Sequence, residues 1–177
     1  MQKLFITILL IISSLSYGQD TSKVKSTKFE EFGSENGVLK KFESKKIGKI
    51  KGFTLYKKTV TNIETEKQYN AVEITAKPGF WDVNRASTAV IIDEDELPSL
   101  IKALKYFLSN VTTDNCKEEC PFFVYNTYGG VRVSCSKTIG AYGGDWHIYI
   151  GRNSPISDVD LEPKEFNSFI SLLESYK

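Results

Sequence analysis

The chain has 177 residues, of which 41% are hydrophobic and 25% charged, with 23 Lys and Arg against 22 Asp and Glu. This composition excludes a disordered chain, and the length fits one globular domain or two small units that share a core. The near-zero net charge argues against a protein that binds nucleic acid over a broadly basic surface.

Residues 1–18 have the pattern of a signal peptide. Lys3 supplies a positive charge, Leu4–Ile12 is apolar, and Ser16 and Gly18 place small residues at a cleavage site. The apolar run is too short to span a bilayer comfortably, and no later apolar stretch approaches the length of a transmembrane helix. We therefore expect an exported protein, periplasmic or extracellular, with no membrane span. A buried N-terminal strand or an uncleaved anchor is the alternative.

The first half of the remaining chain is rich in predicted strands. The polar residues 19–36 lack periodicity and are expected to form an exposed leader, with order allowed from Phe29 onward. Turn-forming residues then separate four predicted strands, at Val38–Phe42, Phe53–Val60, Tyr69–Ala76 and Ala86–Asp93. A helix that ends near Asn110 follows, with one apolar face made of Leu97, Leu100, Ile101, Leu104, Phe107 and Leu108.

The second half follows the same plan. Gly129 and Gly130 mark a hairpin turn between the predicted strands Phe122–Tyr128 and Val131–Lys137. A further strand is expected at Trp146–Arg152, followed by an insertion over Gly151–Leu161. A second helix over Pro163–Tyr176 carries an apolar stripe made of Phe166, Phe169, Ile170, Leu173 and Tyr176.

These elements predict an α+β protein with an antiparallel, twisted sheet system and two helices. We expect a tandem of two strands-plus-helix units, over residues 37–110 and 122–177, joined by a connector at 111–121. Packed together, the units would bury the apolar sheet faces and helix stripes that each leaves exposed alone. The helix stripes align position by position, but any two amphipathic helices can do so. A duplication and a chance similarity therefore both stay open.

The segment Asp93–Phe107 (DEDELPSLIKALKYF) resembles a pattern in a group of uncharacterised small bacterial proteins, which are often exported. In this pattern a strand ends in an acidic turn and runs into a DE-x-x-x-L-I-K-A-L-x-Y helix. Gly37–Ile50 and Tyr149–Gly151 are also similar to that group, and the resemblance covers most of the chain after the signal peptide. It implies no activity, cofactor or catalytic residue. In architecture alone, the doubled unit is similar to the positive cofactor 4/Whirly and Pur-alpha single-stranded nucleic-acid binders.

The cysteines Cys116, Cys120 and Cys135 could form a disulfide, because an exported protein meets an oxidising environment. Cys116 could pair with Cys120, or either could pair with Cys135, and the odd number leaves one thiol free or paired between chains. With His147 the three cysteines reach the ligand count of a structural zinc site. Their spacing is not that of paired zinc knuckles, so we expect no metal and no cofactor.

His147 is the only histidine, so a Ser-His-Asp or Cys-His site would have to use it. Asp145 is two residues away, and Cys135 could face His147 from a neighbouring strand. Because His147 alternates with apolar residues in its strand, an exposed strand histidine is the simpler interpretation. The common hydrolase, zinc-protease and phosphate-loop motifs are absent from the sequence. A non-enzymatic protein is therefore favoured over a small hydrolase-like enzyme that would use His147 and Asp145.

The acidic run Asp93–Glu96 stands at the start of the first predicted helix. It lacks the glycine and the distal glutamate of an EF-hand loop, which argues against a calcium site. The helix dipole favours negative charge at this position, so we expect the run to be solvated there.

A lysine-rich segment is a candidate for contact with an anionic partner, although lysines that only block edge pairing are the simpler interpretation. Between Gly37 and Lys58 the sequence has eight lysines, with Glu43 as the only acid, and Lys45 and Lys46 lie at the centre of the segment. A lipopolysaccharide, polysaccharide or nucleic-acid partner would fit such a run.

Two loops with aromatic residues occupy equivalent connections in the two predicted units. Their candidate binding residues are Phe80 and Trp81 in the first loop, and Tyr142 and Trp146 in the second. The same side chains could instead fold back over the ends of the sheets. The leading hypothesis is an exported, non-enzymatic binding protein with an unknown protein or glycan partner. Nucleic acid is disfavoured by export, and the oligomeric state stays open.

Overall fold

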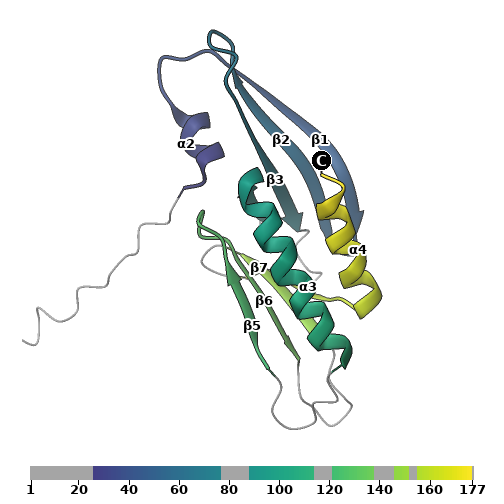
Figure 1. The fold of residues 1–177 in the computed structure, drawn as a ribbon. Helices are drawn as coiled ribbons and strands as arrows, with labels where there is room; N and C mark the ends of the chain where they lie inside the picture. The colour runs from purple at the N-terminus through teal and green to yellow at the C-terminus, as the bar shows by residue number, and fades with distance from the viewer. Residues whose placement is uncertain (1–25, 77–87, 114–120, 138–145, 152–154, 177) are drawn as a thin grey trace, which may run out of the picture.

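The computed structural model describes residues 26–76, 88–113, 121–137, 146–151 and 155–176. It confirms the α+β class, with two four-stranded antiparallel sheets and two long helices (Figure 1). In both sheets the strands lie in space in the order of the chain. Within these described ranges, no helix combines the length and the apolarity needed to span a bilayer.

The first sheet contains a long lysine-rich strand that the sequence only partly predicts. β1 was expected to end at Phe42, but it continues to Ile50 because it pairs with β2 along its whole length, with one irregularity between Lys46 and Gly48. Long charged side chains are tolerated here because β1 is an edge strand. The strands of this sheet are β1 (Lys40–Ile50), β2 (Phe53–Asn62), β3 (Gln68–Ala76) and β4 (Thr88–Asp93).

The second sheet has one strand more than the sequence predicts. The segment expected to be an insertion forms β8, which pairs antiparallel with β7. The strand begins at Pro155, a position where the missing backbone N–H is tolerated. The predicted hairpin turn is confirmed, and Gly130 adopts a positive φ of 80° in it. The strands are β5 (Phe123–Asn126), β6 (Arg132–Lys137), β7 (Trp146–Gly151) and β8 (Pro155–Asp160).

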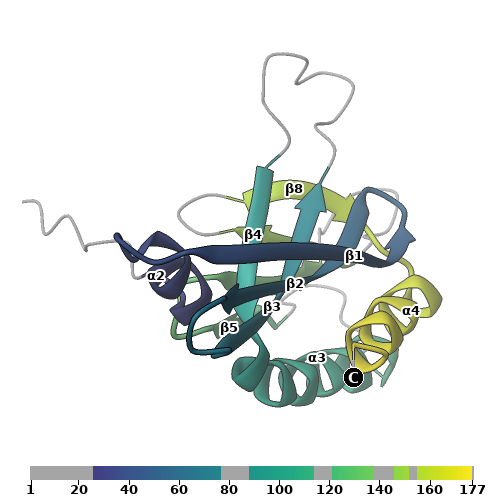
Figure 2. The same ribbon diagram turned by 90° about the horizontal axis from the view of Figure 1, so that it is seen from above.

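The two predicted helices are confirmed as α3 (Leu97–Thr113) and α4 (Pro163–Glu174), and the short 3-10 helix η1 (Glu94–Glu96) leads into α3. The carboxylate of Glu165 accepts a hydrogen bond from the Glu162 N–H at 2.9 Å, which helps to fix the start of α4. It also lies 2.6 Å from the Lys51 ammonium in the β1–β2 turn. The two helices contact each other along one side of the molecule (Figure 2).

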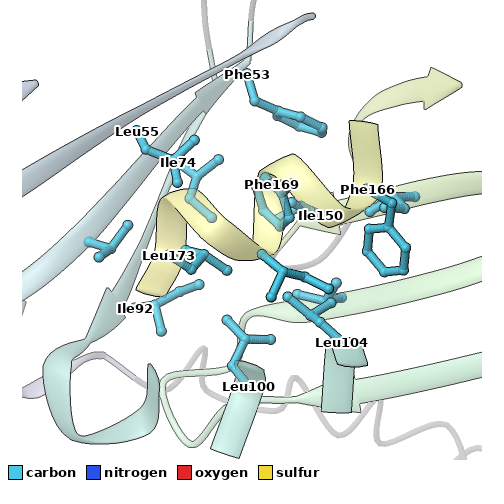
Figure 3. Close-up of a cluster of buried hydrophobic side chains, with 14 of the residues drawn as sticks. Phe53, Leu55, Ile74, Ile92, Leu100, Leu104, Ile150, Phe166, Phe169 and Leu173 are labelled. Atoms are coloured by element: carbon cyan, nitrogen blue, oxygen red, sulfur yellow. The ribbon is translucent and has the colours of Figure 1, made fainter. Parts of the chain in front are cut away.

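One hydrophobic core joins both sheets and both long helices. Leu100, Leu104 and Phe107 of α3 are buried as predicted, while Ile101 is only half-buried. The predicted core residues of α4 are all buried, and Phe169 reaches across to Phe53 of the first sheet, with ring centroids 5.8 Å apart (Figure 3). Through α4, residues from the second half of the chain therefore share a core with the first sheet.

Part of the leader predicted over 19–36 is ordered and buried, in the range from Phe29 onward where the sequence allows order. Lys28–Ser34 forms a short helix, α2, on the face of the first sheet that points away from the main core. Phe29 and Phe32 are buried there against Val60 and Ala71, because their spacing places both rings on one side of the helix.

A side chain from a distant part of the sequence holds the start of α2. The Asp93 carboxylate, at the end of β4, accepts hydrogen bonds from the backbone N–H groups of Lys28 at 2.8 Å and of Phe29 at 3.0 Å. These are N–H groups that a helix cannot satisfy by itself. Asp93 therefore couples the N-terminal segment to the junction between the first sheet and η1.

Both halves of the structure contain four strands followed by a helix. This order agrees with the tandem plan expected from the sequence. Because a shared order of elements is not evidence of common ancestry, the duplication itself stays a prediction.

Candidate functional site

The aromatic loops lie mostly outside the described residues. Phe80, Trp81 and Tyr142 all fall in such segments, so their proposed binding role stays a prediction. Trp146 is described, and it is a core residue rather than a surface contact. It is only 8% exposed and stacks on Phe123, with ring centroids 6.1 Å apart. The binding role expected for Trp146 is therefore wrong, because its position in β7 points its side chain into the core.

The described strands place His147 and Cys135 on opposite faces of the second sheet. Cys135 is paired with Ile148 and belongs to the core, whereas His147 is paired with Ser136 on β6 and with Asp160 on β8. Neighbouring residues of a strand point to opposite faces. A Cys135–His147 site is therefore excluded. Asp145, the other candidate catalytic residue, lies outside the described residues. The described surface has hollows of about 400 and 660 Å³, and neither is lined by His147 or by the residues paired with it.

Cys135 is a free thiol and 1% exposed. Burial raises its pKa to about 12, which keeps it protonated and unreactive at neutral pH. Cys116 and Cys120 lie outside the described residues, so a disulfide between them stays a prediction. No group of three potential metal ligands occurs in the part of the chain that the structure describes.

The lysine-rich segment distributes its charge over both faces of the first sheet. Lys45 is paired with Lys57 and Lys46 with Tyr56, so the two candidate binding lysines point to opposite faces. Both are exposed, and their anion-binding role stays a prediction. Four other lysines of the segment already have carboxylate partners: Lys40 with Glu35, Lys41 with Glu43, Lys51 with Glu165, and Lys58 with Glu73.

A groove that the sequence analysis did not predict lies between α3 and β5. We call it the α3–β5 groove, and its volume is about 660 Å³. Three large side chains at its rim are strongly exposed for their type: Tyr106 at 61%, Phe122 at 56% and Val124 at 37%. The lining residues are Ser99, Lys102, Ala103, Tyr106 and Phe107 of α3, and Phe122, Phe123, Val124 and Tyr125 in and beside β5.

Aromatic contacts and a hydrogen bond hold the two walls of the α3–β5 groove together. Phe123 stacks on Phe107 with centroids 5.3 Å apart and meets the ring of Tyr106 edge-on at 6.0 Å. A side-chain hydrogen bond joins Tyr125 to Ser99 at the α3 wall. The walls are thus tied together before any partner binds, which lowers the entropy cost of binding.

The charged side chains at the α3–β5 groove are basic. Lys102 lines the α3 wall and is exposed, and no carboxylate is among the described lining residues. On the β5 side the Arg132 guanidinium lies 5.8 Å from the centre of the Phe122 ring. The groove therefore combines an apolar, aromatic floor with positive charge near both walls.

A buried carboxylate positions the β5–β6 turn against the start of α3. Glu96 is buried, and its side chain accepts a hydrogen bond from the Tyr128 N–H. The turn also packs closely on Thr27, since a Cβ atom added at Gly129 would lie 2.6 Å from the Thr27 methyl group. Glu96 thereby helps to fix the distance between β5 and α3.

We expect Glu96→Gln to remove a pH dependence from the stability of the fold. Burial raises the pKa of Glu96, so the folded state holds this proton more tightly than the unfolded chain does. Stability from this group is therefore highest at acidic pH and falls as the pH rises through the raised pKa. Urea denaturation at acidic and neutral pH measures this effect. The free energy of unfolding of Glu96→Gln, relative to that of the wild type, should increase as the pH rises.

The control for this comparison is Glu174→Gln, at an exposed carboxylate that pairs with Lys105 at 2.6 Å. Its stability should follow that of the wild type across the same pH range. If the difference in free energy of unfolding between Glu96→Gln and the wild type does not change with pH, the raised pKa of Glu96 in the folded state is contradicted.

A second hollow, of about 400 Å³, lies between α2 and the end of β4. Most of its charged and amide side chains already have partners within the protein. Lys28 pairs with Asp95, Asp93 holds the start of α2, and the Asn70 amide donates to Glu94 at 2.9 Å. The polar residues of this hollow therefore serve to hold α2 against the first sheet. The α3–β5 groove is the better candidate for a binding site.

The sequence contained one local signal for the groove. Phe122, Phe123, Val124 and Tyr125 are all apolar or aromatic, although a strand with one solvent-facing side normally alternates. An apolar pattern on both faces indicates either a central strand or an edge strand that contacts a binding partner. The structure places β5 at an edge.

No family model matches the chain, and neither curated proteins nor solved structures show a match to it. The resemblance of Asp93–Phe107 to small exported bacterial proteins therefore stays a prediction.

Proposed function

We propose that the protein is an exported, non-enzymatic binding protein and that a protein partner occupies the α3–β5 groove. The observation that supports this proposal is the gathering of exposed Tyr106, Phe122 and Val124 around one preformed hollow. Exposed apolar patches with a polar rim are typical of interaction sites, and aromatic residues and Arg are enriched at protein interfaces. Export rests on the pattern of residues 1–18.

The remaining exposed apolar side chains provide a useful comparison. Leu39, Phe42 and Ile63 lie near the far ends of β1 and β2, and Tyr128 lies in the β5–β6 turn. None of these four lines the α3–β5 groove. They allow the effect of losing an exposed aromatic ring to be separated from the effect of altering the groove.

A random-peptide display library selected on the immobilised protein tests the proposal. We expect enriched peptides to bind the wild type and to bind the double variant Tyr106→Ser/Phe122→Ser at least about tenfold more weakly, because central aromatic residues contribute most of the affinity at interfaces. Binding of the purified peptides is measured by fluorescence anisotropy.

The matched control is the double variant Phe42→Ser/Tyr128→Ser, which also loses two exposed aromatic rings. It should bind the enriched peptides as the wild type does, and both double variants should keep the circular dichroism of the wild type. A selection that enriches nothing over a blank surface, or peptides that bind all three proteins equally, would overturn the proposal.

A further inference from the structure

We propose that the partner binds the α3–β5 groove as an extended peptide that adds a fifth strand beside β5, and that this peptide contains both acidic and apolar residues. The inference rests on the proposed function, since it specifies how the groove is occupied and by what chemistry. Three observations carry it: the edge position of β5 among the described strands, the composition of the groove walls and the charge around them.

The first observation is that β5 is the end strand of its sheet. The order of strands is β5-β6-β7-β8, so within the described structure β5 pairs on one side only, with β6. In an antiparallel ladder, alternate residues direct their N–H and C=O groups away from the paired neighbour. β5 therefore offers backbone donors and acceptors along its outer side, which an extended peptide can pair with.

The second observation is that both faces of β5 line the groove. Phe122 and Val124 point to one face of the sheet, and Phe123 and Tyr125 to the other, yet all four line the same hollow. The hollow thus follows the edge of the strand rather than lying above one face. Its other wall is α3, so an added strand would lie along the outer edge of β5, with α3 against one of its faces.

The two walls also match in length. The lining part of α3 runs from Ser99 to Phe107, which corresponds to about 12 Å along a helix. The four lining residues 122–125 span about 10 Å between their first and last Cα atoms. The groove therefore fits a short extended segment, which would place alternate side chains on either side of the backbone.

The third observation is the basic character of the groove. Lys102 on one wall and Arg132 beside Phe122 would attract carboxylates, and the aromatic floor would take apolar side chains. The same charges disfavour a second copy of this chain as the occupant. Two copies joined through β5 would bring their own Lys102 and Arg132 side chains together.

N-methylation of the peptides enriched by display tests the added strand. In an extended peptide the N–H groups of alternate residues point to opposite sides, so each peptide is made in two forms, methylated at odd or at even positions. We expect one form to bind at least about tenfold more weakly than the parent and the other to bind as the parent does, because only one set of N–H groups faces β5.

A charge reversal tests the acidic character of the partner. Lys102→Glu should weaken binding of the enriched peptides and strengthen binding of versions whose acidic residues are replaced by lysine. Glu174→Lys, a charge reversal elsewhere on the helical side, should change neither affinity. Enriched peptides without acidic residues, or without response to Lys102→Glu, would contradict the proposed chemistry.

The outcomes separate this inference from the proposed function. If both methylated forms bind as the parent does while Tyr106→Ser/Phe122→Ser still weakens binding, the groove binds a partner but strand addition is wrong. If no peptide is enriched at all, the proposed function itself fails. A concentration-dependent dimer in sedimentation that Phe122→Ser abolishes would instead identify a second copy as the occupant and overturn the peptide proposal.

Discussion

Phe169→Ala should lower the free energy of unfolding by about 3–5 kcal/mol, the range for losing a buried Phe side chain. Phe169 is 1% exposed and lies in the shared core, where its ring contacts Phe53 from the first sheet. The removed atoms would leave a cavity where α4 meets that sheet. In a chain of this size the loss corresponds to a fall of roughly 6–20 °C in melting temperature.

Chemical denaturation monitored by circular dichroism measures this change. Phe122→Ala is the matched control, because Phe122 is 56% exposed, and it should cost less than about 1 kcal/mol. A small effect of Phe169→Ala, similar to that of Phe122→Ala, would contradict the docking of α4 on the first sheet. A single transition in the wild type is also expected, since the core is continuous.

Asp93→Ala should release α2 from the first sheet at a cost of about 2–3 kcal/mol, the range for losing hydrogen bonds to a buried charged group. The variant leaves the N–H groups of Lys28 and Phe29 without their acceptor. Once α2 detaches, Val60 and Ala71 lose the phenylalanine rings that cover them. Hydrogen exchange of residues 26–36, measured by mass spectrometry, should rise far more than that of α3.

Asp95→Ala provides the control for this second experiment. Asp95 pairs with Lys28, but both side chains are about 60% exposed, so the pair contributes less than about 1 kcal/mol. Exchange in residues 26–36 should change little in this variant. Equal effects of the two substitutions would mean that surface charge, rather than the hydrogen bonds of Asp93, holds α2.

The long helices were predictable because their signal is local. The apolar residues of α3 and α4 recur at helical spacing, and this period alone identifies the buried face. β8 was missed because a short strand that starts at Pro155 depends on pairing with β7 for its structure. The start of α2 has a local signal in the sequence, since Thr27 and Glu30 form a capping box there.

The candidate site was less predictable than the fold because it depends on contacts between distant segments. Nothing in the sequence of α3 indicates that Tyr106 lies against Phe123 of β5. Likewise, Asp93 was expected to serve the helix that follows it, whereas it caps α2, which precedes it by a long stretch of chain. Such roles follow from tertiary structure, which local periodicity does not contain.

Each long helix contacts a strand from the other half of the chain, and this has a consequence for how the protein folds as it is synthesised. α4, the last element, contacts β1, while α3, from the first half, contacts β5. During synthesis the first sheet therefore emerges before the helix that will cover part of its apolar face. The nascent first half has to be kept from aggregating until the C-terminal residues arrive, so premature termination near the C-terminus should yield a chaperone substrate rather than a folded fragment.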